Sequence, residues 1–213
     1  MQKINHYIDG TNFEGNSGKT SDVYNPATGE VSAKVCLANS NETKKAIDVA
    51  AKAFQGWAST PPLQRARILF KFKELIEKHA DDLTMIIVQE HGKVYEDAKG
   101  SLTRGLEVVE FACGIPHLLK GEFTENVGRD VDSWSVRQPL GVCAGITPFN
   151  FPAMVPMWMF PIAIACGNTF ILKPSEKVPS CSMMLADLLT KAGLPKGVLN
   201  VVNGGKEVVD TLI

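Results

Sequence analysis

The apolar residues of this chain follow two different spacings, and these spacings divide the sequence. Over much of the N-terminal half, apolar positions recur every three or four residues, which is the period of an amphipathic helix. Pro61 and Pro62 interrupt the pattern, because proline ends one helix and suits the first turn of the next. The spacing predicts helices from Ser40 to these prolines, from the prolines through Ile76, and over roughly 80–91 and 95–119.

Shorter apolar runs lie on both sides of this helical region. Near the N-terminus, HYIDG and VYNPATGEVSAKV are typical of short strands, and the turn Asn25-Pro26-Ala27-Thr28-Gly29 predicts a hairpin within the second. Beyond Gly141, strand-like runs alternate with helical patterns, which predicts a parallel sheet with right-handed crossovers. The predicted strands are 141–146, 169–173 and 198–202, and the predicted helices are 153–166, 181–192 and one beginning near Lys206.

These elements predict an α/β protein with an N-terminal hairpin and helical layer, followed by the first half of a doubly wound, Rossmann-like parallel sheet. We expect residues 1–122 to hold the hairpin and the helical part of a cofactor-binding domain, 123–140 to form an extended arm, and 141–213 to form the first βαβαβα half. The final KEVVDTLI has no C-terminal glycine, basic last turn or proline, and three strands leave two unpaired sheet edges. We therefore expect this chain to be the front part of a longer protein.

Composition argues against several kinds of partner. Across 213 residues the formal net charge is −1, which disfavours nucleic-acid binding through phosphates and a polybasic membrane anchor. The most apolar segment, 151–166, is too short to cross a bilayer and holds three prolines, so no membrane contact is expected. The five cysteines include no CxxC pair and no nearby His at ligand spacing, so no metal site is expected. Without a signal peptide they indicate free thiols and a cytoplasmic location.

Three polar loops follow the predicted strands: TPFNFP, KPSEKVPS and NGG. In open parallel sheets, ligands bind beyond the carboxyl ends of the strands. In the first loop, Asn150 stands between two phenylalanines and two prolines, where it either shapes a turn through its own backbone or is held out for chemistry.

In the second loop, Lys173 can donate to ribose hydroxyls and Glu176 can accept from them. The same carboxylate would repel a 2′-phosphate, which favours NAD over NADP. The spacing alone equally allows a solvated lysine and a glutamate near a helix. No G-x-G-x-x-G motif is present, so a standard pyrophosphate turn is not predicted.

Four segments together resemble the NAD(P)-dependent aldehyde dehydrogenase superfamily: YNPATGEV, ITPFNFP, PMWMFPIAIACGNTFILKPSE and GLPKGVLNVVNGG. They occur in the family's order and extend through almost the whole chain. Within the superfamily, RGLEVVEFACGIPHLLKG together with PFNFP and PMWMFP is most similar to the CoA-acylating branch that acts on methylmalonate semialdehyde. The resemblance implies the fold and the NAD-binding sheet predicted above.

The resemblance also implies roles for individual residues. In this family a cysteine thiolate attacks the aldehyde, and the Asn that matches Asn150 donates a side-chain N–H to the resulting oxyanion, a catalytic contact worth about 3 kcal/mol. Arg104 would bind the substrate carboxylate, for which a planar guanidinium suits two parallel hydrogen bonds; the alternative is a solvated helix arginine. For Gly204 the alternative to a cofactor role is a plain turn glycine. The residues that would bind the cofactor are Thr147, Pro148, Phe149, Lys173, Pro174, Ser175, Glu176, Lys177 and Gly204.

None of the five cysteines has the sequence surroundings of an activated thiolate, so the nucleophile is expected outside these residues. The resemblance implies the N-terminal part of an NAD-dependent enzyme that oxidises malonate or methylmalonate semialdehyde to acetyl- or propanoyl-CoA with loss of CO2. NAD and coenzyme A would be its cofactors. It would form a homo-oligomer, a tetramer or dimer, through the strand at 123–140. The alternatives are another, non-acylating aldehyde dehydrogenase, acting on succinate semialdehyde or an aliphatic aldehyde, and a non-catalytic nucleotide-binding fragment.

Overall fold

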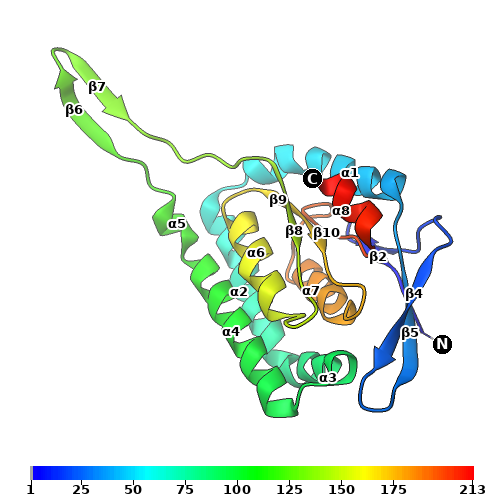
Figure 1. The fold of residues 1–213 in the computed structure, drawn as a ribbon. Coiled ribbons are helices and arrows are strands. Elements are labelled where there is room, and N and C mark those ends of the chain that lie inside the picture. The colour runs from blue at the N-terminus through cyan, green and yellow to red at the C-terminus, as the bar shows by residue number, and fades with distance from the viewer. Residues whose placement is uncertain (1) are drawn as a thin grey trace.

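Three parallel strands form the centre of the fold in the computed structural model, which describes residues 2–213 (Figure 1). They are β8 (Val142–Ile146), β9 (Thr169–Lys173) and β10 (Leu199–Val201). The register pairs Ile146 with Lys173 and Leu172 with Val201, so the strands end at the same edge of the sheet. The predicted α/β fold class and the three predicted strands are confirmed.

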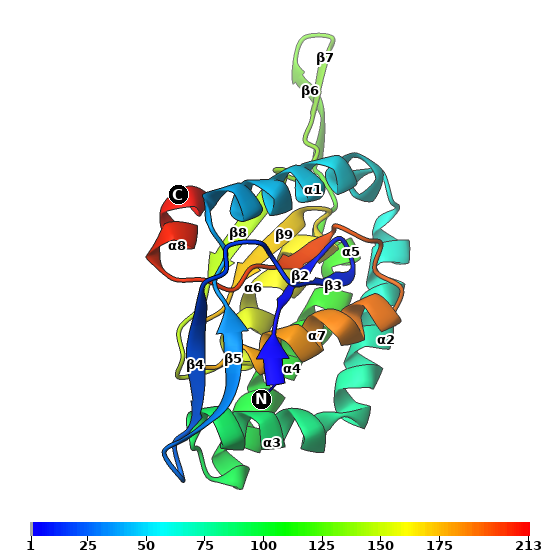
Figure 2. The same cartoon turned by 90° about the vertical axis from the view of Figure 1, so that its right-hand side faces the viewer.

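The middle strand, β9, is buried on both faces, and its alternating side chains enter two different cores. Phe170 and Leu172 lie in the larger hydrophobic cluster, which helices on one face of the sheet share. Ile171 points to the other face and packs against Ala46 and Val208. Figure 2 shows this sheet between α1 and α8 on one side and α6 and α7 on the other. Because the strand is covered on both faces, its three middle residues, 170–172, are all apolar.

The helices follow the predicted periodicity closely. Asn39 caps the first of them, since its side chain accepts the N–H of Glu42 while the Glu42 carboxylate accepts the N–H of Asn39. Gly92, with φ of +82°, ends the third in a left-handed residue. The helices are α1 (Ser40–Ala58), α2 (Pro62–Lys78), α3 (Ala80–His91), α4 (Tyr95–Cys113), α5 (Ile115–Leu118), α6 (Met154–Ala165), α7 (Ser180–Lys191) and α8 (Lys206–Leu212).

The N-terminal segment completes the central sheet. Strand β2 (His6–Ile8) pairs antiparallel with β10, and β3 (Thr11–Phe13) pairs with β2, so the order is β3-β2-β10-β9-β8. The expectation of two unpaired edges is therefore wrong at β10, because β2 satisfies the backbone groups of that edge. Within residues 2–213 the outer edge of β8 pairs with no further strand.

The predicted N-terminal hairpin is confirmed. Strands β4 (Thr20–Asn25) and β5 (Glu30–Cys36) pair antiparallel around the turn that ends at Gly29, whose φ is +74°. Strand β1 (Gln2–Ile4) adds to β5 in parallel, which gives a small three-stranded sheet beside the main one. This small sheet forms one wall of a pocket described below.

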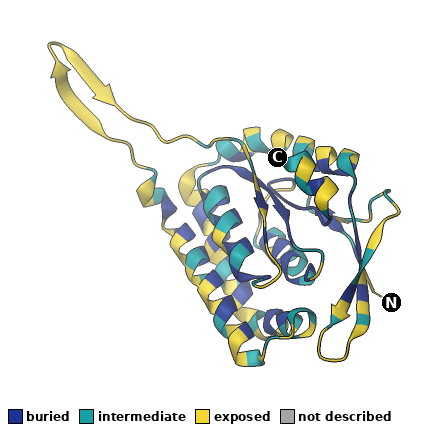
Figure 3. Ribbon diagram, in the orientation of Figure 1, coloured by how far each residue is buried: buried dark blue, intermediate teal, exposed yellow. Residues whose placement is uncertain are grey.

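The arm expected at 123–140 begins with a hairpin that projects from the rest of the protein (Figure 1). Its strands are β6 (Phe123–Gly128) and β7 (Val131–Trp134), and every residue of both is exposed (Figure 3). The sequence pattern predicts extended chain here but not the strand pairing, since the segment lacks a two-residue turn signature. No helix among the described residues is long and apolar enough to cross a membrane.

Candidate functional site

The loops that follow β8 and β9 begin side by side at the carboxyl edge of the sheet. The backbone N–H of Thr147 donates to the carbonyl oxygen of Lys173 over 3.0 Å. The backbone N–H of Val202 donates to the carbonyl oxygen of Leu172 over 2.9 Å. The TPFNFP, KPSE and NGG segments therefore start from three adjacent strand ends, as parallel topology requires. Thr147 is buried, and its Oγ1 has no hydrogen-bond partner among residues 2–213.

Lys173 and Glu176 form a close ion pair in the second loop. Lys173 Nζ lies 3.1 Å from Glu176 Oε2, and Lys173 is only 5% exposed, so it is not the solvated lysine that its spacing also allowed. Burial would raise the pKa of Glu176, but the backbone N–H of Glu176 and the charges of Lys173 and Lys177 outweigh it and hold that pKa below its ordinary value. The Glu176 carboxylate is therefore ionised and fixed in place.

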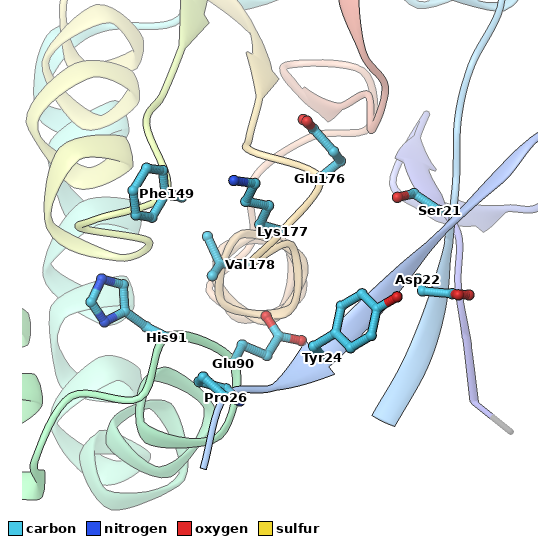
Figure 4. Close-up of a pocket in the computed structure, with 10 residues that line it drawn as sticks. All are labelled: Ser21, Asp22, Tyr24, Pro26, Glu90, His91, Phe149, Glu176, Lys177 and Val178. Atoms are coloured by element: carbon cyan, nitrogen blue, oxygen red, sulfur yellow. The ribbon is translucent and has the colours of Figure 1, made fainter. Parts of the chain in front are cut away.

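A pocket with a volume of about 420 Å³ lies beside this pair (Figure 4). Phe149 of the first loop stacks on His91 with ring centroids 6.2 Å apart, and Lys177 Nζ lies 5.1 Å from the centroid of Phe149. Figure 4 shows these rings facing Tyr24 of β4 across the pocket. The lining residues are Ser21, Asp22, Tyr24, Pro26, Glu90, His91, Phe149, Glu176, Lys177 and Val178. Aromatic and aliphatic walls with a few charged groups suit a nucleotide-sized ligand.

Two residues at the end of α3 line this pocket without having been predicted. Burial raises the pKa of Glu90, whose Oε2 accepts the backbone N–H of Ser180 over 3.1 Å and so caps the N-terminus of α7. Burial, and then the charge of Lys93, lowers the pKa of His91. No local sequence signal marks either residue, because the pocket forms only when α3 packs beside the two loops.

Asn150 is exposed in a turn of the first loop, and its side chain makes no hydrogen bond within residues 2–213. The interpretation that it shapes the turn by bonding its own backbone therefore has no support in the geometry. The amide is left available to a ligand. Phe151, the next residue, leads into α6 at Met154.

Arg104 is exposed on α4, next to the same loop. It lines a second pocket, of about 390 Å³, together with Phe151, and α4 packs closely against α6. Gly105 permits this approach, because a Cβ there would collide with Cε of Met157 and lie 3.1 Å from Cα of Met154. The remaining lining residues are Lys93, Glu96, Asp97, Gly100 and Ser101.

Gly204 is buried, and its lack of a side chain is explained by internal packing. A Cβ at this position would collide with Cγ2 of Val208 on α8. The neighbouring Asn203 anchors the loop: its backbone N–H donates to Nδ1 of His6 over 3.1 Å, and its side chain donates to the carbonyl oxygen of Asn5 over 2.7 Å. These contacts account for the glycine without a ligand, and its cofactor role stays a prediction.

The remaining predicted cofactor residues flank the ion pair. Pro174 is buried, and Ser175 Oγ accepts the backbone N–H of Lys177 over 3.3 Å, which shapes the loop. Pro148 is exposed at the start of the turn that holds Asn150.

None of the five cysteines is an activated thiol. Burial raises the pKa of Cys36, Cys143, Cys166 and Cys181 above its ordinary value and that of Cys113 to about 11. Across residues 2–213, no group of three or more His, Cys, Asp or Glu side chains could hold a metal ion.

Comparisons with known proteins agree with this geometry. The family model for the aldehyde dehydrogenase family matches residues 13–213. The chain therefore belongs to the aldehyde dehydrogenase family, and its mixed α/β fold is that of the NAD-binding region of such proteins. Predicted membership of this family is confirmed.

Two curated relatives illustrate the similarity. The chain is 55% identical over 213 residues to a malonate-semialdehyde dehydrogenase of Pseudomonas aeruginosa, covering 100% of this chain and 43% of that protein. It is 52% identical over 210 residues to the mitochondrial, acylating methylmalonate-semialdehyde dehydrogenase of Arabidopsis thaliana, covering 99% of this chain and 35% of that one. The chain thus spans less than half the length of these relatives.

Solved structures give the same result. A methylmalonate-semialdehyde dehydrogenase from Oceanimonas doudoroffii superposes with a TM-score of 0.97 at 55% identity, over 99% of this chain and 43% of that one. A protein from Sinorhizobium meliloti 1021, complexed with NAD, superposes with a TM-score of 0.97 at 53% identity, over the same shares. An NADP-dependent enzyme of E. coli superposes with a TM-score of 0.94 at 34% identity, over 98% of this chain and 43% of that one.

Proposed function

We propose that the full-length protein containing this chain is an NAD-dependent, CoA-acylating semialdehyde dehydrogenase. It oxidises malonate or methylmalonate semialdehyde to acetyl-CoA or propanoyl-CoA with loss of CO2. The observation that carries the proposal is the pocket shared by Arg104 and Phe151, which puts a guanidinium beside the loop that presents Asn150. The names of the two curated relatives described above support the same substrate class.

In this mechanism the substrate carboxylate binds Arg104, which orients the aldehyde toward the first loop. Asn150 donates its side-chain N–H to the aldehyde oxygen as that oxygen gains negative charge. The attacking thiolate comes from outside these residues, since burial raises the pKa of every cysteine here. Arg104 and Asn150 therefore position and stabilise the substrate.

NAD, when bound, accepts the hydride. The residues at the carboxyl edge of the sheet fit this cofactor, because the buried Thr147 Oγ1 has a free hydrogen-bonding position there and Lys173 and Glu176 form a rigid polar pair. Lys173 and Glu176 would hold the adenosine ribose, the lysine as a donor to its hydroxyls and the carboxylate as an acceptor. The fold alone does not select NAD over NADP, since a protein named as NADP-dependent shares it. The ionised Glu176 carboxylate makes the selection by repelling a 2′-phosphate.

The same proposal includes a homo-oligomer, a dimer or tetramer, in the cytoplasm. The exposed β6–β7 hairpin carries four large apolar side chains, Phe123, Val127, Val131 and Trp134, each more than half exposed. A paired strand of this kind is stabilised when it packs on a second copy of the chain.

Product analysis of the full-length enzyme tests the proposal. Malonate and methylmalonate semialdehyde are incubated with NAD, with and without CoA, and NADH, CO2 and acyl-CoA are measured. Acetyl-CoA or propanoyl-CoA formed only with CoA is the expected result. A free acid formed regardless of CoA favours a non-acylating aldehyde dehydrogenase. An absence of NADH with every aldehyde favours a nucleotide-binding protein without catalysis.

A further inference from the structure

The second pocket contains two cations, Lys93 and Arg104, and neither has a carboxylate within 4.0 Å among residues 2–213. Lys93 differs from the other unpaired lysines of the described chain, all of which are exposed, because it is partly buried. Desolvation of a partly buried ammonium costs free energy, and no carboxylate lies close enough to Lys93 to offset this cost in full. Such a group is therefore a candidate for binding an anion.

Lys93 is held at the loop that presents Asn150. Its Nζ lies 3.8 Å from the centroid of Phe151, a close cation–π contact. The left-handed Gly92 before it ends α3 and turns the chain toward this loop. The ammonium is thus fixed by the residue adjacent to Asn150.

The charges around Lys93 favour binding of an anion. Burial lowers the pKa of Lys93, Asp97 opposes this shift, and the charge of Arg104 adds to it. Glu96 and Asp97 are exposed, so solvent screens them, and they do not pair with Lys93. An anion bound between the two cations would relieve their mutual repulsion.

We propose that Lys93 is a second specificity residue for the substrate carboxylate, acting beside Arg104 in the second pocket. This inference rests on the proposed function, because it assumes that a carboxylated aldehyde occupies that pocket. Arg104 provides two-pronged hydrogen bonding, and Lys93 adds a second point charge to the same carboxylate. The pair selects aldehydes that carry an acid group over simple aliphatic aldehydes.

The test compares kcat/KM for methylmalonate semialdehyde with kcat/KM for propanal in the full-length enzyme. We expect Lys93→Met, which keeps chain length but removes the charge, to lower the ratio of the two values about tenfold. Lys93→Arg should keep this ratio close to that of the unmutated enzyme, since arginine keeps the charge. Lys99→Met is the matched control: Lys99 also faces an aromatic ring, Tyr95, at 5.7 Å, and lies outside the pocket.

Arg104→Leu in the same assay separates failure of this inference from failure of the proposed function. If Arg104→Leu lowers the ratio and Lys93→Met leaves it unchanged, Lys93 is not a specificity residue and the proposed function stands. If neither variant changes the ratio in a folded enzyme, the carboxylate is not bound in this pocket. Equal losses on both aldehydes with a lowered melting temperature would place Lys93 in a structural contact and overturn the inference. Lys93→Gln serves as a second neutral variant if Lys93→Met does not fold.

Discussion

Lys173 Nζ lies 3.1 Å from Glu176 Oε2 at the carboxyl end of β9, in a pair whose lysine is almost entirely buried. A buried ammonium needs such a partner, and the partner in turn stays ionised. The pair therefore holds the Glu176 carboxylate at the strand end where we expect a ribose to bind. This charge gives the cofactor preference a physical cause that can be tested.

We expect Glu176→Gln to lower the ratio of kcat/KM with NAD to kcat/KM with NADP on the order of tenfold. The substitution removes the charge that repels the 2′-phosphate. The measurement is kcat/KM for both cofactors in the full-length enzyme. Glu74→Gln, at an exposed glutamate on α2 that lines neither pocket, is the control. Equal use of both cofactors by the unmutated enzyme would remove this role from Glu176.

Asn150→Ala should lower kcat by roughly 100-fold to 1,000-fold, since one oxyanion donor is worth about 3 kcal/mol in the transition state. The KM for aldehyde should change little, because the hydrogen bond strengthens only as charge develops. Steady-state kinetics, with NAD binding measured separately, checks this. A raised KM with unchanged kcat would make Asn150 a substrate-binding residue instead.

Residues 1–213 alone should not oxidise semialdehyde, because burial raises the pKa of all five cysteines and leaves no thiolate to attack. The chain is incubated with NAD and substrate, and NADH absorbance is followed. A stoichiometric burst that disappears when one of these cysteines is replaced would contradict the expectation.

His6 should make the stability of the protein depend on pH. His6 is fully buried, its Nδ1 accepts the backbone N–H of Asn203, and burial lowers its pKa despite the opposing charge of Glu42. The unfolded chain therefore binds the proton more readily. The stabilising contribution is fully present above the unfolded pKa of about 6.5 and is lost as pH falls from there through the folded pKa.

Thermal unfolding of the full-length protein between pH 7.5 and 5.5 measures this effect. His6→Asn keeps an acceptor near Asn203 but does not titrate, so its melting temperature should fall less steeply over this range. The two proteins are compared by the slope of melting temperature against pH, because the smaller side chain also lowers stability at every pH. Identical slopes for the two proteins would show that His6 does not titrate on unfolding.

Local sequence determined the elements and the loops of this protein. The period of the apolar residues predicted a strand at 169–173 and a helix at 153–166, and the structure has β9 at Thr169–Lys173 and α6 at Met154–Ala165. Parallel topology then predicted that the Asn150 and Glu176 loops share one edge of the sheet. These features depend on neighbouring residues and on the handedness of crossovers, so a single sequence carries them.

Only the tertiary structure decided which distant segments meet. Tyr7 of β2 pairs with Val201 of β10 inside the five-stranded sheet, and Lys93 lies over Phe151, but no local pattern records either contact. The burial of Lys173 is of the same kind, because spacing equally allowed a solvated side chain. A periodic pattern shows which face of an element is buried, but it does not name the partner that covers that face. Pockets, ion pairs and pKa shifts arise from those partners. The position of Lys93 in the second pocket is therefore seen only in the packed structure, where α3, α4 and the loop that holds Asn150 meet.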